Sequence, residues 1–169
     1  MKKTLILTAI AATMISCGTP EVKTISVVPY PNEVDIKDGS FAVAGAEFHF
    51  DGDFDEPSQS IIKNFAEQLS KVTGCQSSVS EGSSSKGFSF EYDPTMGKEA
   101  YSLNIRKNGV KVKASALNGV NYAVQTIKQM LPAEIFGKEE ATDADWTLQC
   151  AKINDEPRFG YRGMHMDVS

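Results

Sequence analysis

Apolar residues at helical spacing mark two segments of the chain. Over residues 58–73 the apolar side chains recur every three or four positions and form one stripe: Ile61, Ile62, Phe65, Ala66, Leu69 and Val72. Gly74 suits the end of this helix. A second stripe covers residues 119–131, with Asn118 as a candidate cap and Pro132 as the stop. The pattern predicts two amphipathic helices.

Apolar residues at every second position predict strands around these helices. The alternation covers residues 34–36, 41–43, 48–50, 88–92, 101–105, 110–112, 146–150 and 161–168. Asp38-Gly39 and Asn108-Gly109 predict hairpin turns, because these residue types tolerate positive φ. Short connections favour antiparallel neighbours. We therefore expect the α+β class, with a mainly antiparallel sheet and two helices packed on one face.

Composition narrows the class of protein. The chain has 169 residues, of which 41% are hydrophobic, and this suits one globular domain. Its 17 basic and 22 acidic residues give a net charge of -5. Proteins that bind nucleic acid usually show a basic excess or stripe. We therefore expect no nucleic-acid partner.

The N-terminus carries an export signal. Lys2 and Lys3 precede a short apolar stretch, so residues 1–16 are predicted to be a signal peptide. Met14-Ile15-Ser16-Cys17 resembles the site at which bacterial lipoproteins are lipidated on Cys, although an ordinary secretion signal containing Cys stays possible. Lipidated Cys17, followed by a tether over 17–23, would anchor an exported protein to a membrane. The expected location is the outer membrane, periplasm or cell surface.

Few residues suggest metal or redox chemistry. Cys75 and Cys150 could pair in an oxidising compartment, but two buried thiols are the preferred interpretation. The only histidines are His49 and His165, which nearly excludes a multi-histidine metal site. His49 is expected to face solvent. The acidic residues of 51–55 lack the Glu that closes a calcium loop, so we interpret them as a solvated turn.

No catalytic motif is visible from spacing alone. The chain has no HExxH, CxxC, GxGxxG, P-loop or GxSxG sequence. The acidic residues of 139–145 lie in a predicted loop that offers nothing to hold a catalytic pair. The residue patterns therefore indicate a secreted α+β domain without an evident activity.

Three segments resemble one family. They are VVPYPNEVDIKDGSFAV at 27–43, EAYSLNIRKNGVKVKASALNGVNYAVQTIKQML at 99–131, and INDEPRFGYRGMHMDVS at 153–169. The second begins with Glu99-Ala100-Tyr101 and carries Gln125-Thr126 in its helix. Together they resemble the N-terminal part of a bacterial β-N-acetylhexosaminidase of glycoside hydrolase family 20. The resemblance covers nearly all of the chain after the signal peptide.

The resemblance implies an activity for a longer protein. Such enzymes remove terminal N-acetylglucosamine or N-acetylgalactosamine from glycans by retaining catalysis, in which the substrate's own acetamido oxygen attacks the anomeric carbon. The family's catalytic Asp-Glu pair lies on a later barrel strand, and Asp167 is not that Asp because no Glu follows it. Residues 24–152 would be the non-catalytic domain, and 153–169 the start of the barrel with its orphan first strand. We expect no catalytic residue in this chain, no cofactor and no metal.

One functional residue follows from the resemblance. Arg162 in PRFGYRG matches the family arginine that binds hydroxyls of the terminal sugar. The partners implied are the C-terminal barrel and, through it, glycans ending in N-acetylhexosamine. A face that meets the barrel should show an apolar patch. The alternative is a stand-alone surface lipoprotein that binds glycans through its exposed sheet, for which the single tryptophan, Trp146, gives little support.

Overall fold

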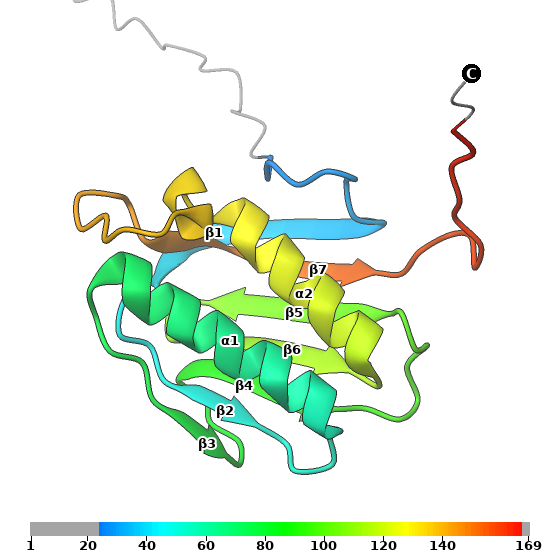
Figure 1. The fold of residues 1–169 in the computed structure, drawn as a ribbon, viewed down its shortest axis with the longest axis horizontal. Helices are drawn as coiled ribbons and strands as arrows, with labels where there is room; N and C mark the ends of the chain where they lie inside the picture. Colours follow the sequence, from blue (N-terminus) through cyan, green and yellow to red (C-terminus); the bar gives the residue numbers. More distant parts are fainter. Residues whose placement is uncertain (1–23, 167–169) are drawn as a thin grey trace, which may run out of the picture.

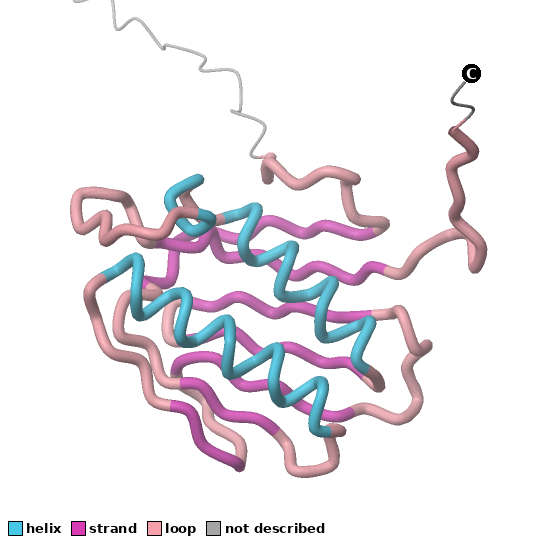
Figure 2. Tube along the Cα trace, in the orientation of Figure 1, coloured by secondary structure: helices cyan, strands magenta, loops and turns pink. Residues whose placement is uncertain are grey.

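The computed structural model describes residues 24–166, which form one seven-stranded sheet with two helices on one face (Figures 1 and 2). The sheet order is β1-β7-β5-β6-β4-β2-β3. The elements are β1 (Glu33–Ala42), β2 (Phe48–Phe50), α1 (Glu56–Thr73), β3 (Val79–Glu81), β4 (Gly87–Tyr92), β5 (Tyr101–Arg106), β6 (Gly109–Ala114), α2 (Leu117–Met130), the 3-10 turn η1 (Ala133–Phe136) and β7 (Thr147–Asp155). The expected α+β class and the placement of both helices are confirmed.

The pairing of the strands is more mixed than the sequence suggested. The pairs β1/β7, β5/β7 and β5/β6 are antiparallel, whereas β4/β6, β2/β4 and β2/β3 are parallel. Helix α1 supplies the crossover from β2 to β3. Strand β3 has only three residues, so the short segment 82–86 can run back along its length and start β4 in the same direction. Short connections therefore do not enforce antiparallel pairing here.

Both helices begin and end close to the predicted positions. The Asp55 side chain accepts a hydrogen bond from the backbone N–H of Ser58 at 3.0 Å, and Gly74 ends α1 with φ of 69°. Helix α2 starts earlier than expected, at Leu117. Ala116 occupies the cap position and forms no side-chain cap bond. Asn118 is thus inside the first turn, and its prediction as the cap is wrong.

The core lies between the sheet and the helices and is rich in aromatic rings. Phe48 stacks on Phe88 with 4.5 Å between ring centroids, and Phe65 of α1 meets both rings edge to face at 5.5 and 5.6 Å. Such pairs add to the stabilisation that area burial provides. The apolar stripe of α2 is buried beside them: Val120, Ala123, Val124 and Ile127.

The two predicted turns have different structures. Asp38-Gly39 makes no hairpin: β1 continues through it with a register shift between Ile36 and Ser40, and Gly39 has φ of 104°. It is a bulge in one strand, where glycine supplies the positive φ.

Asn108-Gly109 does lie at a hairpin, between β5 and β6, but Arg106 pairs with Gly109. The turn residues are therefore Lys107 and Asn108. A Cβ on Gly109 would lie 2.5 Å from the carbonyl oxygen of Gly87. This glycine is needed for close packing of two backbones rather than for positive φ.

The C-terminal part differs from the prediction in two ways. Strand β7 continues to Asp155, three residues beyond the expected domain end at Lys152, and Ile153 is fully buried in this core. The orphan strand expected over 161–168 is not a strand in residues 161–166. A barrel strand obtains its hydrogen bonds from neighbouring barrel strands, and the described residues hold none beside this segment.

The remaining predictions give mixed outcomes. The two cysteines within residues 24–166, Cys75 and Cys150, are free thiols; Cys150 is buried as expected, but Cys75 is exposed. His49 is only partly exposed, since its Nδ1 lies 3.1 Å from the Ser80 hydroxyl. Across residues 24–166 no helix is long and apolar enough to cross a bilayer. Cys17, the signal peptide and Asp167 lie outside the described residues.

Candidate functional site

Polar side chains gather at the end of the sheet where the chain leaves β7. Arg162 Nη2 donates to Glu99 Oε1 at 2.7 Å and to the Tyr122 hydroxyl at 3.1 Å. Its Nη1 donates to the carbonyl oxygen of Phe159 at 2.9 Å, and the Tyr122 hydroxyl donates to Glu99 Oε1 at 3.0 Å. The segment after β7 is thus held against α2 and the start of β5.

Charge in this cluster is balanced locally. Hydrogen bonds from Arg162, and then from Tyr122, hold the pKa of Glu99 below its ordinary value. The hydrogen bond to Glu99 likewise raises the pKa of Arg162. Both groups reach solvent, with side chains 28% and 48% exposed, so the ion pair contributes little to the free energy of unfolding.

A buried polar group lies directly behind this cluster. The ring of Tyr101 is 2% exposed, and its hydroxyl shares a hydrogen bond of 2.7 Å with Thr126 Oγ1 of α2. The same hydroxyl donates to Asp155 Oδ2 at 3.3 Å. Burial raises the pKa of Tyr101 to about 12. The Glu-Ala-Tyr and Gln-Thr motifs therefore meet in space, and they join β5, α2 and the end of β7.

The loop before β1 fastens the same end of β7. The backbone N–H of Asn32 donates to Asp155 Oδ1 at 3.0 Å, and its side-chain amide donates to the carbonyl oxygen of Glu156 at 2.7 Å. The Asn154 side chain donates to Glu33 Oε2 at 2.9 Å. These bonds hold the end of β7, from which residues 157–166 leave the sheet (Figure 2).

An apolar hollow opens next to the polar cluster. It has a volume of about 560 Å³ and is lined by residues 27–29, one side of α2, and residues 157–159 with Arg162. Large hydrophobic side chains on the two flanking segments are exposed: Val28, Tyr30, Phe159, Tyr161, Met164 and Met166. Within residues 24–166 the exposed large hydrophobic side chains of this region thus lie around the hollow and on the segment that leaves the sheet, and none lies on a strand of the open face.

The cluster can hold a segment in place, and the aspartates of the two Asp-Glu dipeptides are already engaged in hydrogen bonds. The sequence contains two Asp-Glu dipeptides, at 55–56 and 155–156. Asp55 caps α1, and Asp155 binds Asn32 and Tyr101. Within residues 24–166 no group of His, Cys, Asp or Glu is arranged to hold a metal ion.

In the structure, the predicted site residue Arg162 binds partners that the sequence did not predict. Arg162 contacts Glu99 and Tyr122 of the domain itself, and apart from the Glu-Ala-Tyr motif no pattern in the primary structure indicates this pairing. Asn32 and Asp155 also carry no sequence signal, because they are ordinary polar residues in the primary structure. Trp146 is 7% exposed and donates its indole N–H to the carbonyl oxygen of Ala141, so it forms no surface platform for sugars.

Comparisons with known proteins place this geometry in one family. Residues 24–156 match the model of glycosyl hydrolase family 20, domain 2. The chain is 31% identical over 150 residues to a beta-hexosaminidase of Porphyromonas gingivalis, covering 86% of this chain but 19% of that protein. It is 25% identical over 151 residues to beta-hexosaminidase subunit A1 of Dictyostelium discoideum, covering 85% of this chain and 27% of that one.

Solved structures show the same fold. Streptomyces plicatus N-acetyl-beta-hexosaminidase aligns with a TM-score of 0.72 and 24% identity, over 81% of this chain and 27% of that protein. The exo beta-N-acetylglucosaminidase of Vibrio harveyi, solved with N-acetylglucosamine, aligns with a TM-score of 0.62 and 27% identity, over 81% and 20%. The chain thus spans about a quarter or less of these relatives. With the match over 24–156, the chain belongs to glycosyl hydrolase family 20 and contains that family's domain 2.

Proposed function

We propose that this chain is the N-terminal, non-catalytic part of an exported exo-acting β-N-acetylhexosaminidase. The observation that supports this most is the 31% identity to the Porphyromonas gingivalis beta-hexosaminidase, of which the chain covers 19%. The longer enzyme would remove terminal N-acetylglucosamine or N-acetylgalactosamine from glycans. The substrate's acetamido oxygen would attack the anomeric carbon, as in other substrate-assisted members of this family.

The domain's role in that enzyme is to support and dock the catalytic barrel. The apolar hollow beside α2 and the exposed side chains that flank it are the surface we assign to this contact. The chain leaves the sheet at the same place, so the next residues are already positioned there by Asn32 and Tyr101. Burial of these apolar side chains by the barrel would stabilise both parts.

Arg162 is the residue of this chain that we assign to substrate binding. Its guanidinium offers several N–H donors in a fixed planar arrangement, which suits neighbouring sugar hydroxyls. In the described structure these donors contact Glu99 and Tyr122. Docking of the barrel would have to redirect the side chain from these partners to the sugar.

A chromogenic assay tests the proposal. The 169-residue chain should not hydrolyse 4-nitrophenyl N-acetyl-β-glucosaminide, whereas the polypeptide encoded by its gene with the codons that follow residue 169 should. In that longer polypeptide, Arg162→Ala should lower kcat/KM at least about tenfold, because donors to the sugar are lost. Lys71→Ala, an exposed cation on α1 outside this hollow, is the control. Turnover by the 169-residue chain, or an unaffected Arg162→Ala, would refute the assignment.

Export and lipidation form a separate part of the proposal. Cys17 would carry the lipid, and residues 17–23 would tether the domain to the outer membrane or cell surface. Cells grown with radiolabelled palmitate should label the wild-type protein and not Cys17→Ala. Equal labelling of a Cys75→Ala control is expected, and label that persists in Cys17→Ala would overturn the anchor.

A further inference from the structure

The open face of the sheet, away from α1 and α2, is polar across all seven strands. Residues directly opposite one another on neighbouring strands form one row: Asp35, Lys152, Asn104, Lys111, Ser89, His49 and Ser80. All the exposed large hydrophobic residues of 24–166 lie outside the seven strands. This face therefore offers hydrogen bonds and charge, and it lacks an apolar surface for packing.

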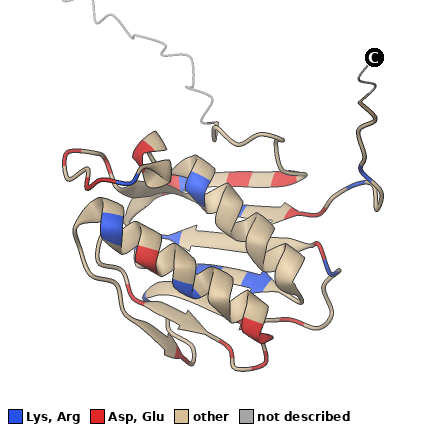
Figure 3. Cartoon of the chain, viewed as in Figure 1, with Lys and Arg blue, Asp and Glu red and all other residues tan. Residues whose placement is uncertain are grey.

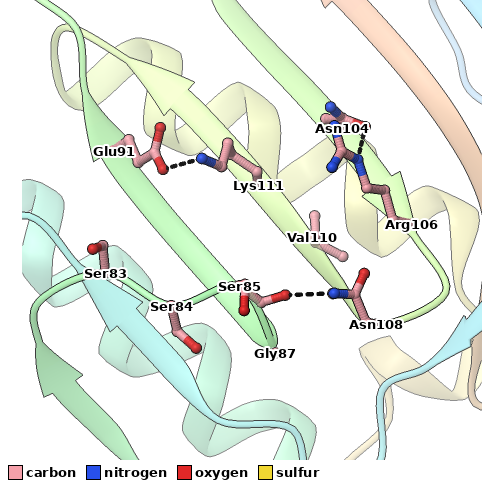
Figure 4. A pocket seen from close by; sticks show the side chains of 11 residues that line it. Ser83, Ser84, Ser85, Gly87, Glu91, Asn104, Arg106, Asn108, Val110 and Lys111 are labelled. Carbon is pink, nitrogen blue, oxygen red and sulfur yellow. Dashed lines mark hydrogen bonds and ion pairs between the residues drawn. The ribbon is translucent and has the colours of Figure 1, made fainter.

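Two hollows on this face meet at the end of β5. The first, of about 340 Å³, lies between the loop 83–85 and strands β4, β5 and β6, and its wall carries Arg106, Asn108 and Lys111 (Figure 4). The second, of about 560 Å³, lies over β1, β5 and β7 and is lined by Lys107 and Lys152 among others. Asn104 and Arg106 line both, so the two hollows lie side by side across the strands, and together they are called the groove below.

The groove is basic although the protein is acidic. Its lining has five Lys and Arg side chains against three carboxylates, whereas the whole chain has a net charge of -5. Figure 3 shows basic positions on β5 and β6 in the middle of the sheet. Lys111 pairs with Glu91, and Lys37 pairs with Asp35 at 2.6 Å. Arg106, Lys107 and Lys152 form no ion pair with any residue of the described range.

We propose that this groove binds an acidic glycan strand, with its carboxylate or sulfate groups on Arg106, Lys107 and Lys152 and its hydroxyls on Asn104 and Asn108. This inference rests on the proposed function. The acidic glycan would be the polymer that the longer enzyme keeps bound while it removes sugars from the chain ends. Unpaired guanidinium and ammonium groups attract anions in a shallow groove. Asn104 Oδ1 already accepts from Arg106 Nε at 3.3 Å, and Asn108 Nδ2 donates to the Ser85 carbonyl oxygen at 2.8 Å. The Asn104 N–H groups and the Asn108 amide oxygen are therefore the groups offered to hydroxyls.

Other ligand classes fit this face less well. A membrane surface would call for apolar side chains that insert between lipids, and the strands expose none that are large. Single-stranded nucleic acid is usually held by aromatic stacking, and neither hollow is lined by an aromatic ring. A neutral sugar could accept hydrogen bonds from these cations, but it would leave their charge uncompensated. Charge complementarity therefore favours an acidic polysaccharide.

Calorimetry with the 169-residue chain tests this inference, using chondroitin sulfate as the acidic probe and chitopentaose as the neutral one. Chondroitin sulfate should bind at low ionic strength and more weakly in about 0.2 M salt, because salt screens exposed charges. Chitopentaose should not bind. The double variant Arg106→Ala/Lys152→Ala should lose about tenfold in affinity for chondroitin sulfate.

The control is Lys63→Ala/Lys71→Ala on α1, which removes the same charge from the helical side and should keep the wild-type affinity. Equal losses in both double variants would show attraction by net charge alone and would overturn the proposal. So would binding of chitopentaose, the absence of chondroitin sulfate binding, or binding of phosphatidylglycerol vesicles in its place. The chromogenic substrate needs no contact with this groove, so a failed hydrolysis assay and a failed binding assay are distinguishable.

Discussion

The two faces of the sheet are built from the same strands and yet have opposite characters. On the covered face, Phe48, Phe65 and Phe88 pack ring against ring and are almost completely buried. On the open face, the alternate residues of the strands are polar and partly solvated. Lys111 of β6 and Asn104 of β5 are examples. Alternation along a strand makes this separation possible. The difference teaches that one face supplies the free energy of folding and leaves the other free for charge and recognition.

The largest test of this comparison is a pair of truncations, one on each face. Phe88→Ala should lower the free energy of unfolding by about 3–5 kcal/mol, because it removes a buried ring from the centre of the cluster. Lys111→Ala should change it by less than about 1 kcal/mol, since an exposed ion pair contributes little. Urea unfolding followed by Trp146 fluorescence measures both. Similar losses for the two variants would contradict the division of roles.

The close approach of the β4 and β6 backbones provides the next test. Gly109→Ala should destabilise the protein by about 1–3 kcal/mol, because the new Cβ would meet the carbonyl oxygen of Gly87 at 2.5 Å. Gly160→Ala is the control, since nothing lies within 4 Å of its Cβ position. Thermal unfolding should separate the two variants clearly. If Gly109→Ala melted at the wild-type temperature, close packing of β4 and β6 would not depend on this glycine.

Tyr101 is a buried polar residue on the covered face, and it predicts a pH effect. Its pKa in the folded state is about 12, above the ordinary value of 10.0. The unfolded chain therefore loses this proton first, and the stabilisation is complete below pH 10 and is lost as the pH rises toward 12. Tyr101→Phe should be less stable than wild type at pH 8 by about 1 kcal/mol. That gap should narrow between pH 10 and 12, and a constant gap would refute the shifted pKa.

The smallest effect is expected at the exposed end of the sheet. Glu99→Gln should leave the unfolding midpoint unchanged but release Arg162, so that NMR signals of residues 159–163 sharpen. In the wild type the same release should occur as the pH falls below 4.5, because the pKa of Glu99 is lowered and its contacts are lost only when it is protonated. Glu156→Gln, which removes a nearby carboxylate, should have no such effect. Unchanged signals in Glu99→Gln would mean that other contacts hold the segment.

The elements with a strong period could be predicted from the sequence. The buried stripe of α1 and the alternation of β4, β5 and β6 were readable because each side chain's environment repeats at the spacing of its own element. Asp38-Gly39 was misread because a bulge and a hairpin need the same residue types, and only pairing with β7 distinguishes them. The parallel pairs were missed for a related reason: strand direction depends on partners that are distant in the sequence.

The site was less predictable than the fold. Arg162 could be singled out only through a family motif, and its contacts with Glu99 and Tyr122 join residues 63 and 40 positions apart. The bond from Asn32 to Asp155 spans 123 positions. The residues in such hydrogen bonds do not recur at the spacing of a helix or a strand, so no pattern in the primary structure predicts these bonds.

The bulge in β1 also bears on how copies of this chain can meet. β1 and β3 are the two edges of the sheet. An uninterrupted edge strand invites a further strand from another molecule, but β1 is broken at Gly39 and carries Asp35 and Lys37, and β3 is only three residues long. Growth of a continuous intermolecular sheet, the first step toward a fibril, is thus blocked at both edges, and crowded copies would stick together through Val28 and its neighbours beside α2 instead.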